Sequence, residues 1–271
     1  AYYAEWIDSI SQSTSAEFVV NETLDGVQKW SDVAMDADGD FVIVWESASQ
    51  DPDGSWGIYG RRYNSMGQPL LTDTNGDSIV DEDDMVDVNN NGIIDLDDPA
   101  ETAPVFRVNT AYTGHQLNPA VAMDDEGNFV VVWGTAGQDF SFSNDVHAQQ
   151  YASKGEQLGD EFVVNSFDLP GVSGPAVGGF EVNPAIAMSG RTGDFVVAWD
   201  QVVTQTNGVV TDSIVAARRF SPFAEPLGPE FEADTAPGAG GGNIERVARN
   251  AQLDMTDDGT YRTLAGRGEA A

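Results

Sequence analysis

The sequence predicts an all-β fold, a β-propeller built from four-stranded antiparallel blades. The first observation behind this prediction is a repeated phrase of two apolar segments joined by a Gly-containing turn, which occurs four times in the same order. The second is regular spacing, because 18 residues separate Trp45 from Tyr63 and again Trp133 from Tyr151. The third is the lack of helical periodicity between the apolar segments. Repeats of this kind are typical of propellers.

Each repeat unit is predicted to hold four strands. The first, as in Val33 to Met35, is short and ends in a tight turn, and the second, Phe41 to Trp45, is apolar on both faces like a strand covered on both sides. The third strand ends in an aromatic residue, and the fourth carries a phenylalanine. The first two strands recur at 33–45, 121–133, 186–199 and 253–261. The third strands end at Tyr63, Tyr151 and Phe220, and the fourth strands carry Phe18, Phe106, Phe162 and Phe231.

The two ends of the chain each hold part of a unit. Residues 1–21 offer a third strand at 2–7 and a fourth strand, whereas residues 249–265 offer only the first two strands. One interpretation is a composite blade that closes a ring of three whole blades plus one. The other is a truncated fourth blade in a fragment of a longer array. In either case residues 1–271 form a single propeller or propeller fragment.

The charge balance restricts the partners and the location. The chain has 45 acidic and 12 basic residues and a formal net charge of −33, which argues against nucleic acid and anionic membranes as partners. It has no cysteine, and no apolar run approaches the length of a membrane span. Cations are the natural counter-charge, and we expect an extracellular or cell-surface protein of a bacterium.

An insertion at residues 72–103 has the most specific chemistry of the chain. Two acidic loops follow each other there, residues 73–84 and 87–98, with oxygen side chains at alternate positions. Calcium takes six to eight oxygen ligands, and curled loops of this pattern supply them from side chains and one backbone carbonyl. The predicted calcium ligands are Asp73, Asn75, Asp77, Ile79, Asp81, Asp84, Asp87, Asn89, Asn91, Ile93, Asp95 and Asp98, with Ile79 and Ile93 contributing their carbonyl oxygens.

The paired loops resemble EF-hand-type calcium loops, closest in style to those of dockerins and thrombospondin type 3 repeats. They depart from a true EF-hand because only Met85 and Val86 separate them and because the last ligand of each loop, Asp84 or Asp98, is Asp rather than Glu. The resemblance implies bound Ca²⁺ of extracellular-grade affinity. The alternative is a disordered acidic linker.

Two other motifs have competing interpretations. The acidic turn at Asp36, Asp38 and Asp40 resembles a cation site, but the third copy lacks its carboxylates, and we interpret it as a structural turn. The arginine pairs 61–62 and 218–219 resemble the anion clamp of sialidases, but the second unit has glutamines in their place. We expect these arginines to pair with acidic residues between blades.

The sequence lacks the motifs of several hydrolase classes. It has no cysteine, no Gly-x-Ser-x-Gly and no His-Glu-x-x-His, and His115 and His147 stand alone. We therefore predict that the chain is not an enzyme. The alternative is a carbohydrate-active propeller enzyme with catalytic carboxylates in the loops 46–57, 134–147 and 200–213.

The repeated phrase, followed by Glu-Phe-Val-Val-Asn, resembles the tandem propeller-type repeats of large bacterial surface and secreted proteins. The resemblance implies a calcium-stabilised structural or binding module for surface display, adhesion or a matrix. Its expected partners are calcium, glycans, other surface or matrix proteins, or further copies of the chain. Assembly into filaments through strand exchange at the half-blades is a third hypothesis.

Overall fold

All regular elements in the described part of the structure, a computed structural model, are β-strands, which confirms the all-β prediction. The structure describes residues 17–23, 25–48, 50–51, 54–72, 85, 104–136, 145–165, 183–204, 210–233, 252–255 and 261–264. No helix long and apolar enough to cross a membrane occurs in these ranges.

The first sheet contains the four predicted strands and one more. β1 (Gln28–Met35), β2 (Phe41–Ala48) and β3 (Trp56–Tyr63) pair in an antiparallel order. Two short strands then share the outer side of β3: β4 (Pro69–Leu70) next to the end of β3, and β5 (Phe106–Arg107) next to its middle. The sequence did not predict β4.

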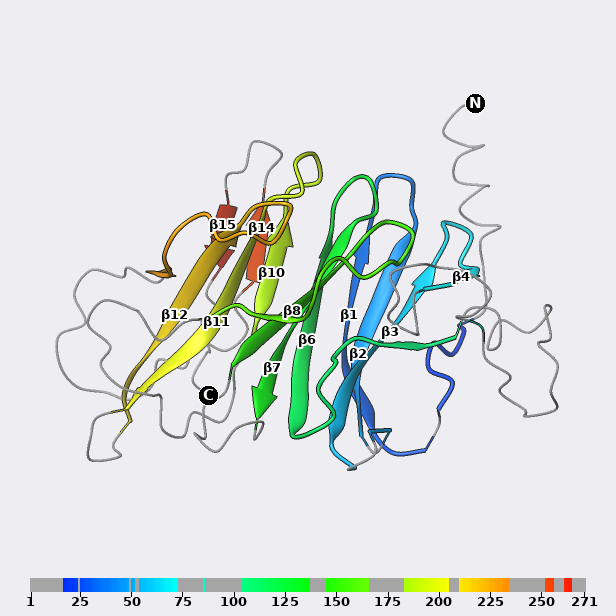
Figure 1. The fold of residues 1–271 in the computed structure, drawn as a ribbon, viewed down its shortest axis with the longest axis horizontal. Helices are drawn as coiled ribbons and strands as arrows, with labels where there is room; N and C mark the ends of the chain where they lie inside the picture. Colours follow the sequence, from blue (N-terminus) through cyan, green and yellow to red (C-terminus); the bar gives the residue numbers. More distant parts are fainter. Residues whose placement is uncertain are drawn as a thin grey trace.

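The other sheets repeat this order along the chain (Figure 1). The second sheet consists of β6 (His115–Met123), β7 (Phe129–Ala136), β8 (Val146–Tyr151) and β9 (Phe162–Val163). The third consists of β10 (Ala185–Met188), β11 (Phe195–Thr204), β12 (Val210–Phe220) and β13 (Phe231–Glu232). The fourth holds only β14 (Gln252–Met255) and β15 (Tyr261–Leu264) in the described part of the chain.

The first hairpin of every sheet has the same register. Its methionine lies opposite an aromatic residue, in the pairs Met35–Phe41, Met123–Phe129, Met188–Phe195 and Met255–Tyr261. The Asp36 carboxylate accepts the backbone N–H groups of Asp38 and Asp40, both at 2.9 Å, and Asp124 does the same in the second sheet. In the third sheet the Ser189 hydroxyl accepts the N–H of Thr192 instead. These bonds support the interpretation of the acidic segment as a structural turn.

The sheets pack face to face, so that each has a leading face toward the preceding sheet and a trailing face toward the next. The leading face of the second sheet, including Val121, Val131 and Trp133, packs on the trailing face of the first, including Val42 and Val44. The leading face of the third sheet packs in the same way on the trailing face of the second. Burial of both faces explains why the second strands are apolar throughout.

One aromatic contact recurs at every one of these interfaces. The phenylalanine of a fourth strand packs against the aromatic residue at the end of the next sheet's third strand. The ring centroids are 5.5 Å apart for Phe106–Tyr151 and 5.8 Å for Phe162–Phe220. Phe18 makes the same contact with Tyr63, at 5.4 Å. Residues 17–21 therefore occupy the same position relative to the first sheet as β5 occupies relative to the second sheet.

The arginine pairs lie between sheets, but they mostly bind carbonyl groups rather than carboxylates. Arg61 does form an ion pair with Glu22, at 3.1 Å. Arg62, in contrast, donates to the carbonyls of Leu71, Lys154 and Ser153, and Arg218 donates to that of Val164. Burial lowers the pKa of Arg62 to about 10, so the group remains charged at neutral pH. Arg61, Arg62 and Arg218 lie between sheets as predicted. Arg61 has an acidic partner as predicted, whereas Arg62 and Arg218 donate to carbonyl groups.

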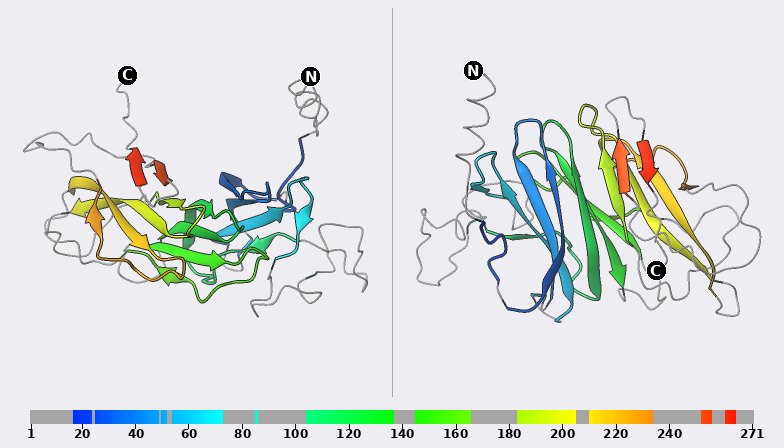
Figure 2. Two further views of the ribbon diagram at one scale, coloured as in Figure 1. Left: turned by 90° about the horizontal axis from the view of Figure 1, so that it is seen from above. Right: turned by 180° about the vertical axis from the view of Figure 1, so that it is seen from behind.

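The described sheets do not close into a ring. In the view from above, they follow one another along an arc, with β14–β15 and β1 on the same side of it (Figure 2). The fourth sheet contacts the third through β10 and β11. Ring closure through a composite blade involves residues 1–16 and 249–251, which lie outside the described ranges. A closed propeller ring therefore remains a prediction.

Candidate active site

Polar side chains from three sheets meet along the first hairpins and form what we call the inner-end cluster. Its members come from equivalent positions of the repeat. Trp30, Asn118 and Asn183 each lie five residues before the hairpin methionine, while Glu46 and Asp200 each follow the tryptophan of the second strand. The inner-end cluster consists of Lys29, Trp30, Glu46, Asn118, Asn183 and Asp200.

A continuous chain of polar contacts links the two carboxylates of the inner-end cluster. Glu46 on β2 forms an ion pair with Lys29 at 2.8 Å and accepts the backbone N–H of Asn118 at 2.8 Å. The Asn118 amide then donates to the Asn183 side-chain oxygen at 3.0 Å. The Asn183 amide in turn donates to Asp200 on β11 at 3.1 Å. Three units of the repeat thus contribute to one connected site.

Two members of the inner-end cluster have an unusual backbone conformation. Trp30 and Asn118 both have φ of 54°, and each lies where the register of its first hairpin shifts. Positive φ is uncommon for residues other than glycine, and for a bulky side chain it is an outlier. Such strain is found most often at functional sites. In a regular strand the N–H of Asn118 would pair with the neighbouring strand. The bulge directs this N–H to the Glu46 carboxylate instead.

Aromatic rings flank the cluster on the side of the first sheet. The Lys29 ammonium lies 4.5 Å from the centre of the Trp56 ring and 5.7 Å from that of Trp30. Trp30 is 60% exposed, whereas Glu46 is fully buried beneath Lys29. Both carboxylates of the cluster are buried, and the exposed Trp30 ring lies beside the Lys29–Glu46 pair.

The inner-end cluster has the groups needed for acid–base chemistry on a polyhydroxylated substrate. Two carboxylates from different strands are the usual pair in glycoside hydrolysis, where one protonates the leaving group and the other acts as base or nucleophile. Amide side chains such as Asn118 and Asn183 hydrogen-bond to hydroxyl groups as donor and acceptor. Aromatic rings offer an apolar face to a ligand while one edge remains in water.

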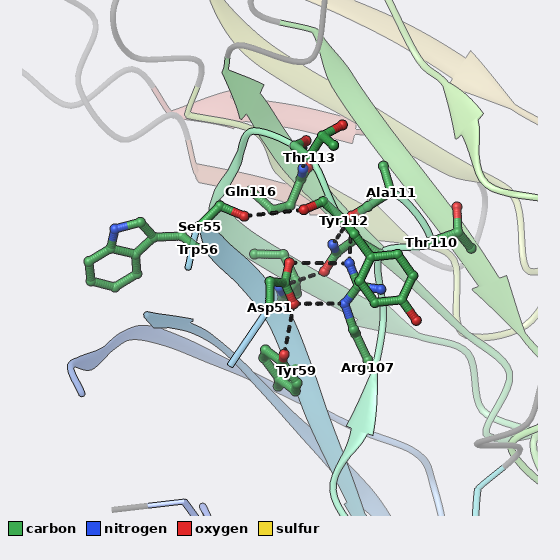
Figure 3. Close-up of polar contacts among 12 residues, drawn as sticks. Asp51, Ser55, Trp56, Tyr59, Arg107, Thr110, Ala111, Tyr112, Thr113 and Gln116 are labelled. Atoms are coloured by element: carbon green, nitrogen blue, oxygen red, sulfur yellow. Dashed lines mark hydrogen bonds and ion pairs between the residues drawn. The ribbon is translucent and has the colours of Figure 1, made fainter. Parts of the chain in front are cut away.

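A second polar cluster lies where β2 leads into β3, and it is a structural one (Figure 3). The buried Asp51 carboxylate accepts the Tyr59 hydroxyl at 2.9 Å and binds Arg107 at 3.0 Å and 3.2 Å. The Tyr112 ring covers the guanidinium of Arg107 at 3.6 Å. Burial, together with the negative charge of Asp51, raises the pKa of Tyr59 above its ordinary value. All the polar groups of Asp51 and Tyr59 are used internally, which favours a role in holding β3 against β5.

The two histidines do not form a catalytic group with each other. His115 accepts the backbone N–H of Trp56, at 3.4 Å. His147 lies 2.6 Å from the carboxylate of Glu161, which also accepts the N–H and the hydroxyl of Thr110, both at 2.7 Å. This contact joins the segment after β5 to the second sheet. It is a link between neighbouring units.

The Glu161 carboxylate makes the stability of the fold vary with pH in the acidic range. Burial acts to raise its pKa, but the hydrogen bonds from His147 and Thr110 outweigh burial, so the pKa lies below the ordinary value of 4.5. A carboxylate with a lower pKa in the folded than in the unfolded state stabilises the fold above the unfolded-state pKa and loses this contribution as pH falls through the folded-state pKa. We therefore expect the melting temperature to fall more steeply below about pH 4.5 in the wild type than in Glu161→Gln.

Thermal melts across the acidic range measure this difference. Glu126→Gln is the matched control, because Glu126 is an exposed residue of a turn. It is expected to follow the wild type at every pH. Equal acid sensitivity of Glu161→Gln and the wild type would contradict the assignment.

The structure describes part of the loops named for the enzyme alternative, but none of the predicted calcium ligands. All twelve predicted calcium ligands lie outside the described residues. Within the described ranges, no group of three or more His, Asp or Glu side chains is placed to hold a metal ion. Of the loops named for the enzyme alternative, 46–57 and 200–213 begin with Glu46 and Asp200, which the structure places on strands β2 and β11. Residues 137–144 of the third loop are not described.

Comparison with known proteins gives similarity of fold only. No protein-family model and no curated protein matches the chain. Similar solved structures include an N-acetylgalactosamine deacetylase from F. plautii with blood group B trisaccharide (13% identity, TM-score 0.41) and a Hadza microbial sialidase (9%, 0.41). A third is an exo-1,5-α-L-arabinanase from a bovine ruminal metagenomic library (11%, 0.39). The matches cover 76%, 83% and 80% of this chain but 53%, 39% and 67% of those chains, respectively.

The prediction that the chain is not an enzyme is contradicted, because these similar structures are enzymes. That prediction depended on missing serine, cysteine and histidine motifs, and the absence of such motifs does not exclude catalysis by carboxylates. Identities this low assign neither an activity nor a substrate to this chain. The site is therefore judged on its own geometry.

Proposed function

We propose that this protein is a carbohydrate-active enzyme of propeller type that cleaves glycosidic bonds at the inner-end cluster. The observation that carries the proposal is the convergence of Glu46 and Asp200, from different repeat units, on one hydrogen-bonded network beside an exposed tryptophan. Equivalent positions that carry different residues in different units, and a tryptophan at positive φ at one of them, favour a site over a simple repeat contact.

In this proposal each side chain has a defined role. Glu46 and Asp200 form the carboxylate pair of acid and base or nucleophile. Asn118 and Asn183 orient Asp200 and bind sugar hydroxyl groups, and Trp30 stacks on the apolar face of a sugar ring. Lys29 has a long flexible stem and is partly exposed. Its displacement from the Trp56 ring gives the substrate access both to that ring and to the Glu46 carboxylate.

A screen of polysaccharides, with release of reducing ends as the readout, tests the proposal. The wild type is expected to cleave at least one polysaccharide. Glu46→Gln and Asp200→Asn are each expected to lower that rate by about 10²–10⁴-fold, the usual contribution of a general acid or base. Glu126→Gln, an exposed carboxylate in a turn, is the matched control and retains the wild-type rate.

Two results would overturn this assignment. One is turnover that survives in both active-site variants, with melting temperatures showing that all variants fold. The other is binding of glycans by the wild type without cleavage of any polysaccharide in the screen. The second result would leave a glycan-binding module.

Calcium, the propeller ring and an extracellular location complete the proposal. The paired acidic loops at 73–84 and 87–98 support calcium, and the repeat of face-packed four-stranded sheets supports a propeller. The resemblance to repeats of bacterial surface proteins and the net charge support an extracellular location and partners on a cell surface or in a matrix. Protease sensitivity of residues 72–103 with and without EGTA tests the calcium part, since identical cleavage in both would contradict it.

A further inference from the structure

The lysine of the inner-end cluster lies in a cage that binds a positive charge. The Lys29 ammonium lies 2.8 Å from Oε1 of the Glu46 carboxylate. It lies 4.5 Å from the centre of the Trp56 ring and 5.7 Å from that of Trp30. We call Glu46, Trp56 and Trp30 the ammonium cage. A carboxylate and the faces of aromatic rings are the groups with which proteins bind organic cations, including those of ligands.

Neighbouring elements hold two walls of the ammonium cage in place, whereas the cation inside it is carried by a flexible stem. The Glu46 carboxylate accepts the N–H of Asn118 at 2.8 Å, and the N–H of Trp56 donates to the His115 ring at 3.4 Å, so both walls are bound to the second sheet. Lys29 lies opposite Glu46 in the register of β1 and β2, and its side chain is 43% exposed. Its long aliphatic stem lets the ammonium move into solvent while the walls stay where they are.

The Glu46 carboxylate needs a positive charge beside it. It is fully buried, and its Oε1 atom, which faces Lys29, accepts no hydrogen bond from the described residues. Removing one partner of a buried ion pair is strongly unfavourable, because the other charge is left buried without compensation. A neutral hydroxyl group in the place of Lys29 leaves Glu46 in that state, and an anionic group is repelled by it. The ligand group that takes the place of Lys29 must therefore be a cation.

The net charge and the chemistry of glycoside cleavage favour the same class of ligand. A formal net charge of −33 attracts cationic polymers and repels anionic ones. In glycoside hydrolysis, hydrogen bonds to the substituent next to the reacting carbon strengthen in the transition state. In the common amino sugars this substituent is the nitrogen. A protonated amine at that carbon can therefore pair with the carboxylate that acts on the neighbouring one.

We propose, on the basis of the function proposed above, that the substrate of the inner-end cluster is a polysaccharide of amino sugars with free, protonated amines. One sugar ammonium replaces that of Lys29 in the ammonium cage, where it pairs with Glu46 and lies against the Trp56 ring. Lys29 supplies the counter-charge in the free protein and moves into solvent when the substrate binds. An N-acetylated sugar is a poor ligand of the cage, because its neutral amide cannot replace the lost charge.

Chemical rescue of Lys29→Ala tests this proposal. The substitution leaves Glu46 buried without a counter-charge, and we expect it to lower the melting temperature. Glucosamine and galactosamine, in a buffer in which their amines are protonated, are compared with their N-acetylated forms at the same concentration. At least one of the two amines is expected to raise the melting temperature of Lys29→Ala by about 2 °C or more, because a ligand that binds only the folded state stabilises it. The N-acetylated sugars are expected to leave it unchanged.

Two variants control for effects outside the ammonium cage. Lys154→Ala removes the other lysine of the chain, which is exposed in a turn, and it is expected to melt like the wild type with either kind of sugar. Lys29→Ala combined with Glu46→Gln leaves no charge to be paired, so the amines are not expected to stabilise it. An equal response of this double variant and of Lys29→Ala would overturn the proposal. Absence of any response of folded Lys29→Ala to both amines would overturn it as well.

Calorimetry on the wild type gives a second measurement, which does not require Lys29→Ala to fold. Oligomers of glucosamine and of galactosamine are compared with N-acetylated oligomers of the same length. The better of the two amines is expected to bind at least about tenfold more tightly than its N-acetylated form, the level of one charge-assisted hydrogen bond. Trp56→Ala is expected to weaken this binding about 3–30-fold by removing a cation–π contact. Phe223→Ala, which removes an exposed aromatic residue elsewhere, is expected to leave it unchanged.

The failure of this proposal and the failure of the proposed function give different results. Equal affinity for the amines and the N-acetylated forms would overturn the proposal. If polysaccharides without amines are still cleaved, and the cleavage depends on Glu46 and Asp200, the proposed function stands. Preferential binding of an amine that depends on Trp56, without cleavage of any polysaccharide, would instead support the ammonium cage and overturn the proposed enzyme.

Discussion

Replacing Asp51 by Ala is expected to lower the free energy of unfolding by about 3–5 kcal/mol, the usual cost of removing one partner of a buried ion pair. The carboxylate of Asp51 neutralises Arg107 and accepts the Tyr59 hydroxyl (Figure 3). The substitution leaves the guanidinium largely buried without a counter-charge, and it leaves the hydroxyl of Tyr59 without its acceptor. Chemical denaturation of the wild type and the variant measures the difference.

A double variant separates the charge from the lost packing. If the main cost is the unpaired guanidinium, Asp51→Ala combined with Arg107→Leu is expected to be more stable than the sum of the two single changes predicts. A loss below about 1 kcal/mol for Asp51→Ala, the level of an exposed pair, would contradict the structural role of this cluster.

Replacing Arg62 by Ala is expected to cost about 3 kcal/mol, because hydrogen bonds to charged groups contribute about 1.5–3 kcal/mol each and the freed carbonyls regain some water. Arg62 extends from β3 to the turn after β8, where it donates to Ser153 and Lys154, and it also donates to Leu71. Gly155 leaves space for this side chain, because a Cβ atom there would lie 2.6 Å from Nη1 of Arg62. The substitution removes a link between the first and second sheets.

The repeat itself supplies the conservative variant for this experiment. Gln150 is the equivalent residue of the second sheet, and it donates to the Pro222 carbonyl of the third at 2.6 Å. Arg62→Gln is therefore expected to retain part of the link and to lie between the wild type and Arg62→Ala in urea denaturation. Stability equal to wild type in Arg62→Ala would show that the link contributes nothing.

The strands and their order were predictable because the same physical demand acts on every unit. A second strand buried on both faces must be apolar along its length, and the phrase around Phe41 to Trp45 recurs for this reason. The third-strand aromatic and the fourth-strand phenylalanine recur because they touch across each interface. Comparison of the copies therefore recovered most elements and their spacing. It did not predict the two-residue strand β4, and residues 17–21, predicted as a fourth strand, form no strand in the structure.

The candidate active site was not predictable residue by residue, for the opposite reason. A comparison of repeats detects only residues that recur in every unit. Glu46 and Asp200 do not recur, because the equivalent residue of the second sheet is Gly134. Their meeting with Asn118 and Asn183 depends on how three sheets pack, which no single strand determines. One signal was available in the sequence, because an acidic residue follows the tryptophan of an otherwise apolar second strand at two positions, Glu46 and Asp200. The ring closure and the calcium loops involve residues outside the described ranges.

The divided outer edge of the first sheet explains how the chain accommodates a long insertion. Leu70 pairs with Arg62 and Phe106 pairs with Gly60, so the chain leaves β3 and returns to it within two residues of the same strand. The second and third sheets have the same arrangement with short connections, because Gln157 and Pro226 bridge to Tyr151 and Phe220 before β9 and β13 begin. The ends of such a connection are already fixed side by side, and lengthening it costs only a slowly growing closure entropy. Each of the first three sheets thus has a ready attachment point at its outer edge, where evolution or an engineer can add a module without altering the register of the sheet.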